Sequence, residues 1–145
     1  MPAHADRTLN RVLIRIYRSL LQYVGECWPW TPATAGTAEQ NAINALVNSQ
    51  QASVARLAEF LANREWPVTF GVYPAEFTDL HYVSLEFLLS RLVTDQNAIV
   101  TALEQVQQAV RDDPHAAALL HDVTAAEKGH LYQLRELAKR APAAV

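Results

Sequence analysis

Four polar side chains interrupt apolar stripes that otherwise repeat with the spacing of an α-helix. They are Gln50, Asp95, and the pair Glu127 and His130. Residues at positions i and i+3 share a helix face, so Glu127 and His130 can reach the same ion. Burial without a partner costs about 1–3 kcal/mol for a neutral group and far more for a lone charge. Two carboxylates and an imidazole at one level must therefore share protons, form ion pairs or bind a cation.

The stripes predict the helices that carry these residues. They read Ile43, Val47, Gln50, Val54, Leu57 and Leu61; then Leu85, Leu88, Leu92, Asp95, Ile99, Ala102 and Val106; then Leu120, Val123, Glu127, His130, Leu134 and Leu137. Each polar residue falls near the middle of its stripe, and Tyr17 lies near the middle of a fourth segment. Because helices packed side by side bring their midpoints to one level, we expect one buried polar layer of Tyr17, Gln50, Asp95, Glu127 and His130.

The chain as a whole predicts a single all-α domain over residues 1–145, with helices at about 8–24, 38–63, 78–111 and 114–140. Gly25 is a typical helix end, and Thr37 with Gln40 forms a capping box. Asp113 followed by Pro114 indicates a helix start, because proline suits the first helical position.

The linker between the second and third helices is long enough to run the length of the molecule. An extended segment from Arg64 to Phe77 spans roughly 45 Å, whereas a helix over 38–63 is roughly 40 Å long. We therefore predict one long crossover between these helices. A bundle in which every helix alternates in direction is the alternative, because linker length does not exclude it.

This pattern resembles the ferritin-like superfamily, which includes ferritins, rubrerythrins and other di-iron carboxylate proteins. The resemblance covers the four-helix layout and the motif Glu127-Lys128-Gly129-His130. Asp95 resembles the lone carboxylate that the family places on another helix. The second helix departs from the pattern, with Gln50 where the family has Glu-x-x-His, and the first helix has no acid at mid-height. The resemblance implies a ferritin-like four-helix bundle in which only three of the six expected ligands remain.

Three interpretations of the central layer follow. We favour a metal-free hydrogen-bonded network without cofactor, in which the protein is a binding or interaction protein rather than an enzyme. The alternative is one iron, manganese or zinc ion held by Asp95, Glu127 and His130, with Gln50 or water completing the shell and with redox or hydrolytic activity. A dinuclear oxidase is the least favoured, because a second cation lacks compensating carboxylates.

The remaining histidines give no second candidate site. His81 falls on the apolar stripe near the start of the third helix, where we expect a satisfied core or capping role. His4, His115 and His121 are expected in solvent.

Aromatic residues concentrate in the two long connections. Trp28 and Trp30 follow the first helix, and Trp66, Phe70 and Tyr73 lie along the crossover. We expect them to cover the ends and the seam of the bundle, since a long linker must bury side chains to stay ordered. An aromatic-lined pocket for a small ligand is the other interpretation.

Composition and charge limit the partners. A net charge of -3 leaves no basic footprint for nucleic acid, and no segment has the apolar length of a membrane span. One cysteine excludes an intramolecular disulfide framework and favours the cytoplasm, and the preference for arginine over lysine suggests a bacterial source. The first helix is apolar over a wide arc that includes Ile14 and Leu21, which predicts a second contact, either with the crossover or with a second copy. We predict a homodimer through this helix.

Overall fold

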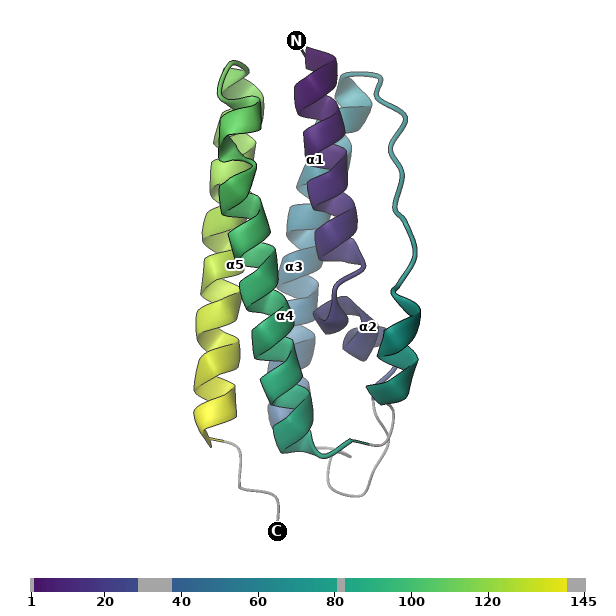
Figure 1. The fold of residues 1–145 in the computed structure, drawn as a ribbon, viewed down its shortest axis with the longest axis vertical. Coiled ribbons are helices and arrows are strands. Elements are labelled where there is room, and N and C mark those ends of the chain that lie inside the picture. The colour runs from purple at the N-terminus through teal and green to yellow at the C-terminus, as the bar shows by residue number, and fades with distance from the viewer. Residues whose placement is uncertain (1, 29–37, 81–82, 141–145) are drawn as a thin grey trace.

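The computed structural model describes residues 2–28, 38–80 and 83–140, and within these ranges the chain is all-α with no strand. Four long helices lie along the long axis of the molecule (Figure 1). They are α1 (Pro2–Tyr17), α3 (Ala38–Asn63), α4 (Leu85–Gln105) and α5 (Pro114–Arg140). The short helix α2 (Leu20–Glu26) and the 3-10 helices η1 (Ala75–Leu80) and η2 (Gln107–Val110) complete the element order.

The second and fourth predicted helices have the bounds that the sequence indicated, at 38–63 and 114–140. Asp113 caps α5 by accepting a hydrogen bond from the backbone N–H of Ala116 at 3.2 Å. Pro114 occupies the first helical position, where its missing N–H costs nothing. The local cap chemistry of α5 was therefore sufficient to place its start.

The first predicted helix, at 8–24, is wrong in its bounds, because the chain starts its helix earlier and breaks at Arg18 and Ser19. Ser19 has extended backbone angles (φ -72°, ψ 163°), and its side chain accepts a hydrogen bond from the N–H of Gln22. Asp95 Oδ2 accepts from the N–H of Leu20 at 2.9 Å. The start of α2 leaves backbone N–H groups without partners inside the helix, and two side-chain oxygens accept from them. One belongs to Ser19 and the other to Asp95 of α4.

The third predicted helix, at 78–111, is also wrong in its bounds. Residues 75–80 form η1, and α4 begins only at Leu85. Ser84 caps α4 by accepting from the N–H of Phe87 at 3.1 Å. The C-terminal part tightens into η2, so α4 ends at Gln105.

Residues 64–74 run along the outside of the helices and return the chain to the opposite end before α4 begins (Figure 1). This crossover packs on α1. Asn10 donates to Thr69 O at 2.9 Å and accepts from its N–H at 3.0 Å. Gly71 has φ +67°, and a Cβ there would lie 2.7 Å from Ile14 Cγ2, so glycine is required both for the turn and for the close contact.

The crossover supplies the second contact that the wide apolar arc of helix 1 demanded. Ile14 meets Gly71, and the Tyr17 ring packs edge-on against Phe70 at 5.6 Å between centroids. Leu21 is 1% exposed within the same chain. The apolar residues that suggested a homodimer are therefore covered without one.

Two of the tryptophans pack as covering residues. Trp66 lies against the core at one end of the molecule and Trp28 against the core at the other. Trp30 lies outside the described residues, as does His81. His4, His115 and His121 are exposed, as predicted.

A polar junction ties three elements together where α3 ends. Arg64 donates to Asp113 Oδ1 at 2.9 Å and to Asp6 Oδ1 at 3.1 Å, and it also pairs with Asp113 Oδ2. Asp6 is 4% exposed. Hydrogen bonds from Arg64 lower the pKa of Asp113 from 3.8 to about 2. The junction therefore holds α1, the end of α3 and the start of α5 through charge.

Candidate functional site

Glu127 is the centre of a buried polar layer formed by α3, α4 and α5. Its side chain is 0% exposed. Its Oε1 accepts hydrogen bonds from Gln50 Nε2 at 2.6 Å and Gln96 Nε2 at 3.0 Å. Its Oε2 lies 2.7 Å from His130 Nδ1. Both carboxylate oxygens are thus engaged by side chains of this chain.

The amides around Glu127 are oriented by a further set of hydrogen bonds. Gln50 Oε1 accepts from Gln22 Nε2 at 2.9 Å and from Ser19 Oγ at 3.1 Å. Gln22 Oε1 in turn accepts from Gln51 Nε2 at 3.1 Å. Reversing the Gln50 amide would place its carbonyl against the carboxylate and its NH₂ against another NH₂. The network therefore specifies which end of the Gln50 amide points to Glu127.

The opposite end of the network reaches the surface through His130. This ring is 3% exposed, and its Nε2 lies 2.8 Å from the hydroxyl oxygen of Ser49. Ser49 itself is exposed on α3. The hydrogen-bonded path thus begins at Gln51 on α3, passes through the interior and returns to solvent at Ser49.

The layer divides the hydrophobic core into two clusters. On α3 one cluster ends at Val47 and the other begins at Val54, with Gln50 between them. On α4 the corresponding gap between Leu92 and Ile99 holds Gln96. Ser19 and Glu127 occupy the same kind of gap in their own segments. The polar groups therefore form one level across the molecule.

The structure brings together Gln50, Glu127 and His130, three of the five residues expected in the layer. Asp95 lies at the flank, 20% exposed, where it accepts from Arg15 at 3.0 Å and from Leu20 N–H. Tyr17 lies on the other side of α1, under the crossover, and the Arg18 guanidinium sits 4.6 Å from its ring centroid. Neither of these two residues contributes to the hydrogen bonds around Glu127.

The described residues bring together no group of three metal-ligating side chains. Within residues 2–28, 38–80 and 83–140, no group of three or more His, Cys, Asp or Glu side chains could hold an ion, so Asp95, Glu127 and His130 form no such group. The direction of the amides gives a second reason to expect no cation at Glu127. Gln50 and Gln96 point N–H donors at Glu127, and a cation at that oxygen would face their partial positive charges.

Sequence reasoning missed Gln96, Ser19, Gln22 and Ser49. Gln96 follows Asp95 directly, and the apolar stripe of α4 permits either position to face the core. Placing Asp95 rather than Gln96 on the predicted stripe of α4 shifted the core-facing position by one residue. Ser19 and Gln22 enter the layer only because helix 1 breaks, and a serine three residues before a glutamine was the available signal for a new helix start.

A pocket of about 260 Å³ opens between α1 and α4. Its apolar wall consists of Val12, Ala102, Leu103 and Val106. Arg11 lines the same pocket and is exposed. The pocket therefore combines an apolar wall with a cation.

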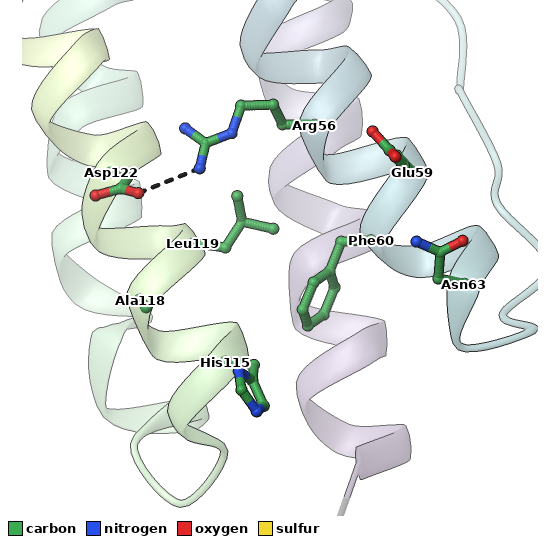
Figure 2. Close-up of a pocket in the computed structure, with 8 residues that line it drawn as sticks. All are labelled: Arg56, Glu59, Phe60, Asn63, His115, Ala118, Leu119 and Asp122. Carbon is green, nitrogen blue, oxygen red and sulfur yellow. Dashed lines mark hydrogen bonds and ion pairs between the residues drawn. The ribbon is translucent and has the colours of Figure 1, made fainter.

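A second hollow of about 370 Å³ lies between the C-terminal half of α3 and the N-terminal part of α5. Figure 2 shows Arg56 of α3 reaching Asp122 of α5 across it, at 3.2 Å, with His115 and Phe60 facing the space between the helices. Arg56 and Asp122 are more than half exposed, so their pairing contributes little stability.

Comparison with known proteins gave no relatives: no protein-family model, no curated protein and no solved structure matches this chain. No helix among the described residues has the length and apolar character to cross a bilayer.

Proposed function

We propose that this protein is a ferritin-like four-helix bundle without di-iron chemistry, and that it acts as a binding protein. The observation that carries the proposal is the satisfied carboxylate of Glu127, which accepts from two glutamine amides and faces His130. A di-iron protein needs its carboxylates free to ligate, whereas here amides replace the acids of two helices. The long crossover between α3 and α4 agrees with the ferritin-like topology (Figure 1).

Metal analysis tests this part of the proposal. The purified chain is treated with EDTA, incubated separately with Fe²⁺, Mn²⁺ and Zn²⁺, desalted and analysed for bound metal. We expect no stoichiometric metal from any incubation. One ion per chain that disappears in a His130→Ala variant would establish the metalloprotein alternative instead.

The binding site that the surface supports best is the pocket between α1 and α4. An apolar wall beside an exposed arginine suits a small anionic amphiphile, whose carboxylate pairs with Arg11 while its apolar part contacts Val12, Leu103 and Val106. Arg15 lines the same pocket, but Asp95 already accepts one of its N–H groups. Arg11 is therefore the cation that recognises the ligand.

Calorimetry with octanoate tests this assignment, with octanol as the uncharged ligand of equal chain length. We expect octanoate to bind and octanol to bind more weakly. Arg11→Gln should weaken octanoate binding about tenfold, which corresponds to about 1.4 kcal/mol. Arg7→Gln is the matched control, because Arg7 is exposed on the same helix but does not line the pocket. Equal weakening by both variants, or equal binding of octanol, would refute the site.

A homodimer through helix 1 remains a prediction. Its interface would have to use the exposed side of α1, which carries His4, Arg7 and Arg11. Arg7 and Arg11 repel their own copies across a two-fold axis, and salt screens this repulsion. The prediction is that sedimentation gives about twice the 16.1 kDa chain mass. Because salt screens the repulsion, we expect more dimer at high salt. A monomer at every salt concentration would contradict the prediction.

A further inference from the structure

The surface end of the central network has the geometry of a nucleophilic triad. Ser49 Oγ lies 2.8 Å from His130 Nε2, and His130 Nδ1 lies 2.7 Å from Glu127 Oε2. A hydroxyl, an imidazole and a carboxylate connected in this order are the groups that activate serine in acyl-transfer enzymes, and they are recognised by geometry rather than by fold.

The network also determines which imidazole nitrogen carries the proton. An ionised Glu127 only accepts hydrogen bonds, and its Oε1 already accepts from Gln50 and Gln96. The other oxygen, Oε2, therefore accepts from a protonated Nδ1 of His130. In the neutral imidazole this leaves Nε2 without a proton, as an acceptor for the Ser49 hydroxyl. The ring is thus held in the tautomer that a general base requires.

Ser49 is exposed on the side of α3 that contacts α5 through His130. It lies one heptad from Arg56, which lines the hollow of Figure 2. It lies one heptad in the other direction from Ala42, which lines a third hollow of about 300 Å³ between the same helices. On α5 the neighbouring Gly129 is exposed, and a Cβ added there would meet nothing within 4 Å. Packing therefore gives no reason for this helix-weakening glycine.

We propose that Ser49 is a nucleophile, that His130 is its general base and that Glu127 orients the base, so that Ser49 accepts acyl groups from activated esters. The proposal rests on the metal-free centre proposed above, because a metal on His130 or Glu127 would occupy the atoms that the relay needs. It goes further by assigning a reactive group to the surface end of that centre.

The chemistry is balanced without a cofactor. Ser49 Oγ forms a bond to the carbonyl carbon while its proton moves to His130 Nε2. The carbon–oxygen bond to the leaving group then breaks, and the leaving alcohol or phenol takes the proton from Nε2. Water attacks the acyl-serine by the same route and releases the carboxylic acid and free Ser49.

The substrate class follows from what the site lacks. Backbone N–H groups in the middle of α3 and α5 are engaged in their own helices, so the described residues around Ser49 present no backbone oxyanion hole. Loss of even one oxyanion donor costs about 10²–10³ in rate. We therefore expect reaction with esters that have good leaving groups, such as aryl esters, and not with peptides.

Covalent labelling tests the proposal. The EDTA-treated chain is incubated with a fluorophosphonate probe, whose phosphorus–fluorine bond breaks as the serine–phosphorus bond forms, and the labelled peptide is identified by mass spectrometry. We expect the label on Ser49 and not on Ser90, an exposed serine within α4 that serves as the internal control. p-Nitrophenyl acetate should acetylate the same residue.

Variants separate nucleophile from base. Ser49→Ala should abolish the label without affecting folding, because its side chain is exposed. His130→Gln, whose amide can still donate to Glu127, should slow labelling by about 10² or more. Label on Ser90 to the same extent, no label on Ser49, or an unchanged rate in a folded His130→Gln variant would each refute the proposal. EDTA removes metal beforehand, so absence of label would refute the nucleophile proposal for Ser49 and would not show that metal blocks the site. The metal analysis described above tests the metal-free centre separately.

Discussion

The central layer and the Arg64 junction both bury polar groups between helices, but they satisfy them differently. In the layer, a single carboxylate receives hydrogen bonds from uncharged amides and faces an imidazole. At the junction, one guanidinium holds two carboxylates. The Glu127 carboxylate at the centre of the layer is 0% exposed, whereas the Arg64 side chain is 23% exposed and reaches solvent. The contrast indicates that hydrogen-bond donors replace counter-charges where water is excluded, and that ion pairs are used where water remains close.

Glu127→Ala should break the layer with the largest effect. The substitution leaves the N–H groups of Gln50 and Gln96 without their acceptor and opens a cavity, so we expect a loss of about 3–5 kcal/mol in the free energy of unfolding. Urea denaturation measures it. Glu104→Ala is the control, because Glu104 is exposed and pairs with Lys128 at the surface. A similar small loss in both variants would mean that the layer contributes little.

Arg64→Ala should have a smaller effect, about 2–3 kcal/mol, because solvent can partly replace the guanidinium around Asp6 and Asp113. The same denaturation experiment applies. If this variant loses more than Glu127→Ala, the proposed difference between sealed amides and accessible ion pairs is wrong.

Acid should weaken the junction through Asp113. Because its pKa in the folded protein is about 2, below the usual 3.8, its contribution is complete above pH 3.8 and is lost as pH falls towards 2. The expected loss is about 2 kcal/mol. Asp113→Asn retains a helix cap but not the charge, so its stability should change less over this pH window. Parallel curves for the two proteins would contradict the assignment.

The smallest effect is expected at the exposed pair across the hollow of Figure 2. Arg56→Ala removes the partner of Asp122, and both side chains are more than half exposed. We expect a change of at most about 1 kcal/mol, and thermal melting at low and high salt should show that the difference falls with ionic strength.

The sequence predicted the start of α5, which depends on local chemistry, and missed the break before Leu20, to which a distant contact contributes. Asp113 and Pro114 start α5 through interactions within a few residues. The break before Leu20 depends instead on Asp95, which is remote in sequence and accepts the exposed N–H. The same contact removes Asp95 from the predicted layer. An error in one helix thus produced an error in the site.

Glu127 and His130 were identified from their spacing, and Gln50 from its place on an apolar stripe. Gln96 was missed because two adjacent residues of α4 were compatible with the stripe, and packing between helices decides between them. Ser49 was missed because an exposed serine within a helix carries no pattern, and its role depends on how α5 lies against α3.

The single polar level has a consequence for how the helices can slide. Moving α3 along its axis by one turn, about 5.4 Å, would carry Gln50 into a zone of leucines and place a valine opposite Glu127. The same holds for α4, whose only buried amide is Gln96 among the described residues. Purely apolar helix faces tolerate such an axial shift, since leucine contacts leucine equally well one turn away. The amides and the acid therefore set the axial register of the long helices relative to one another.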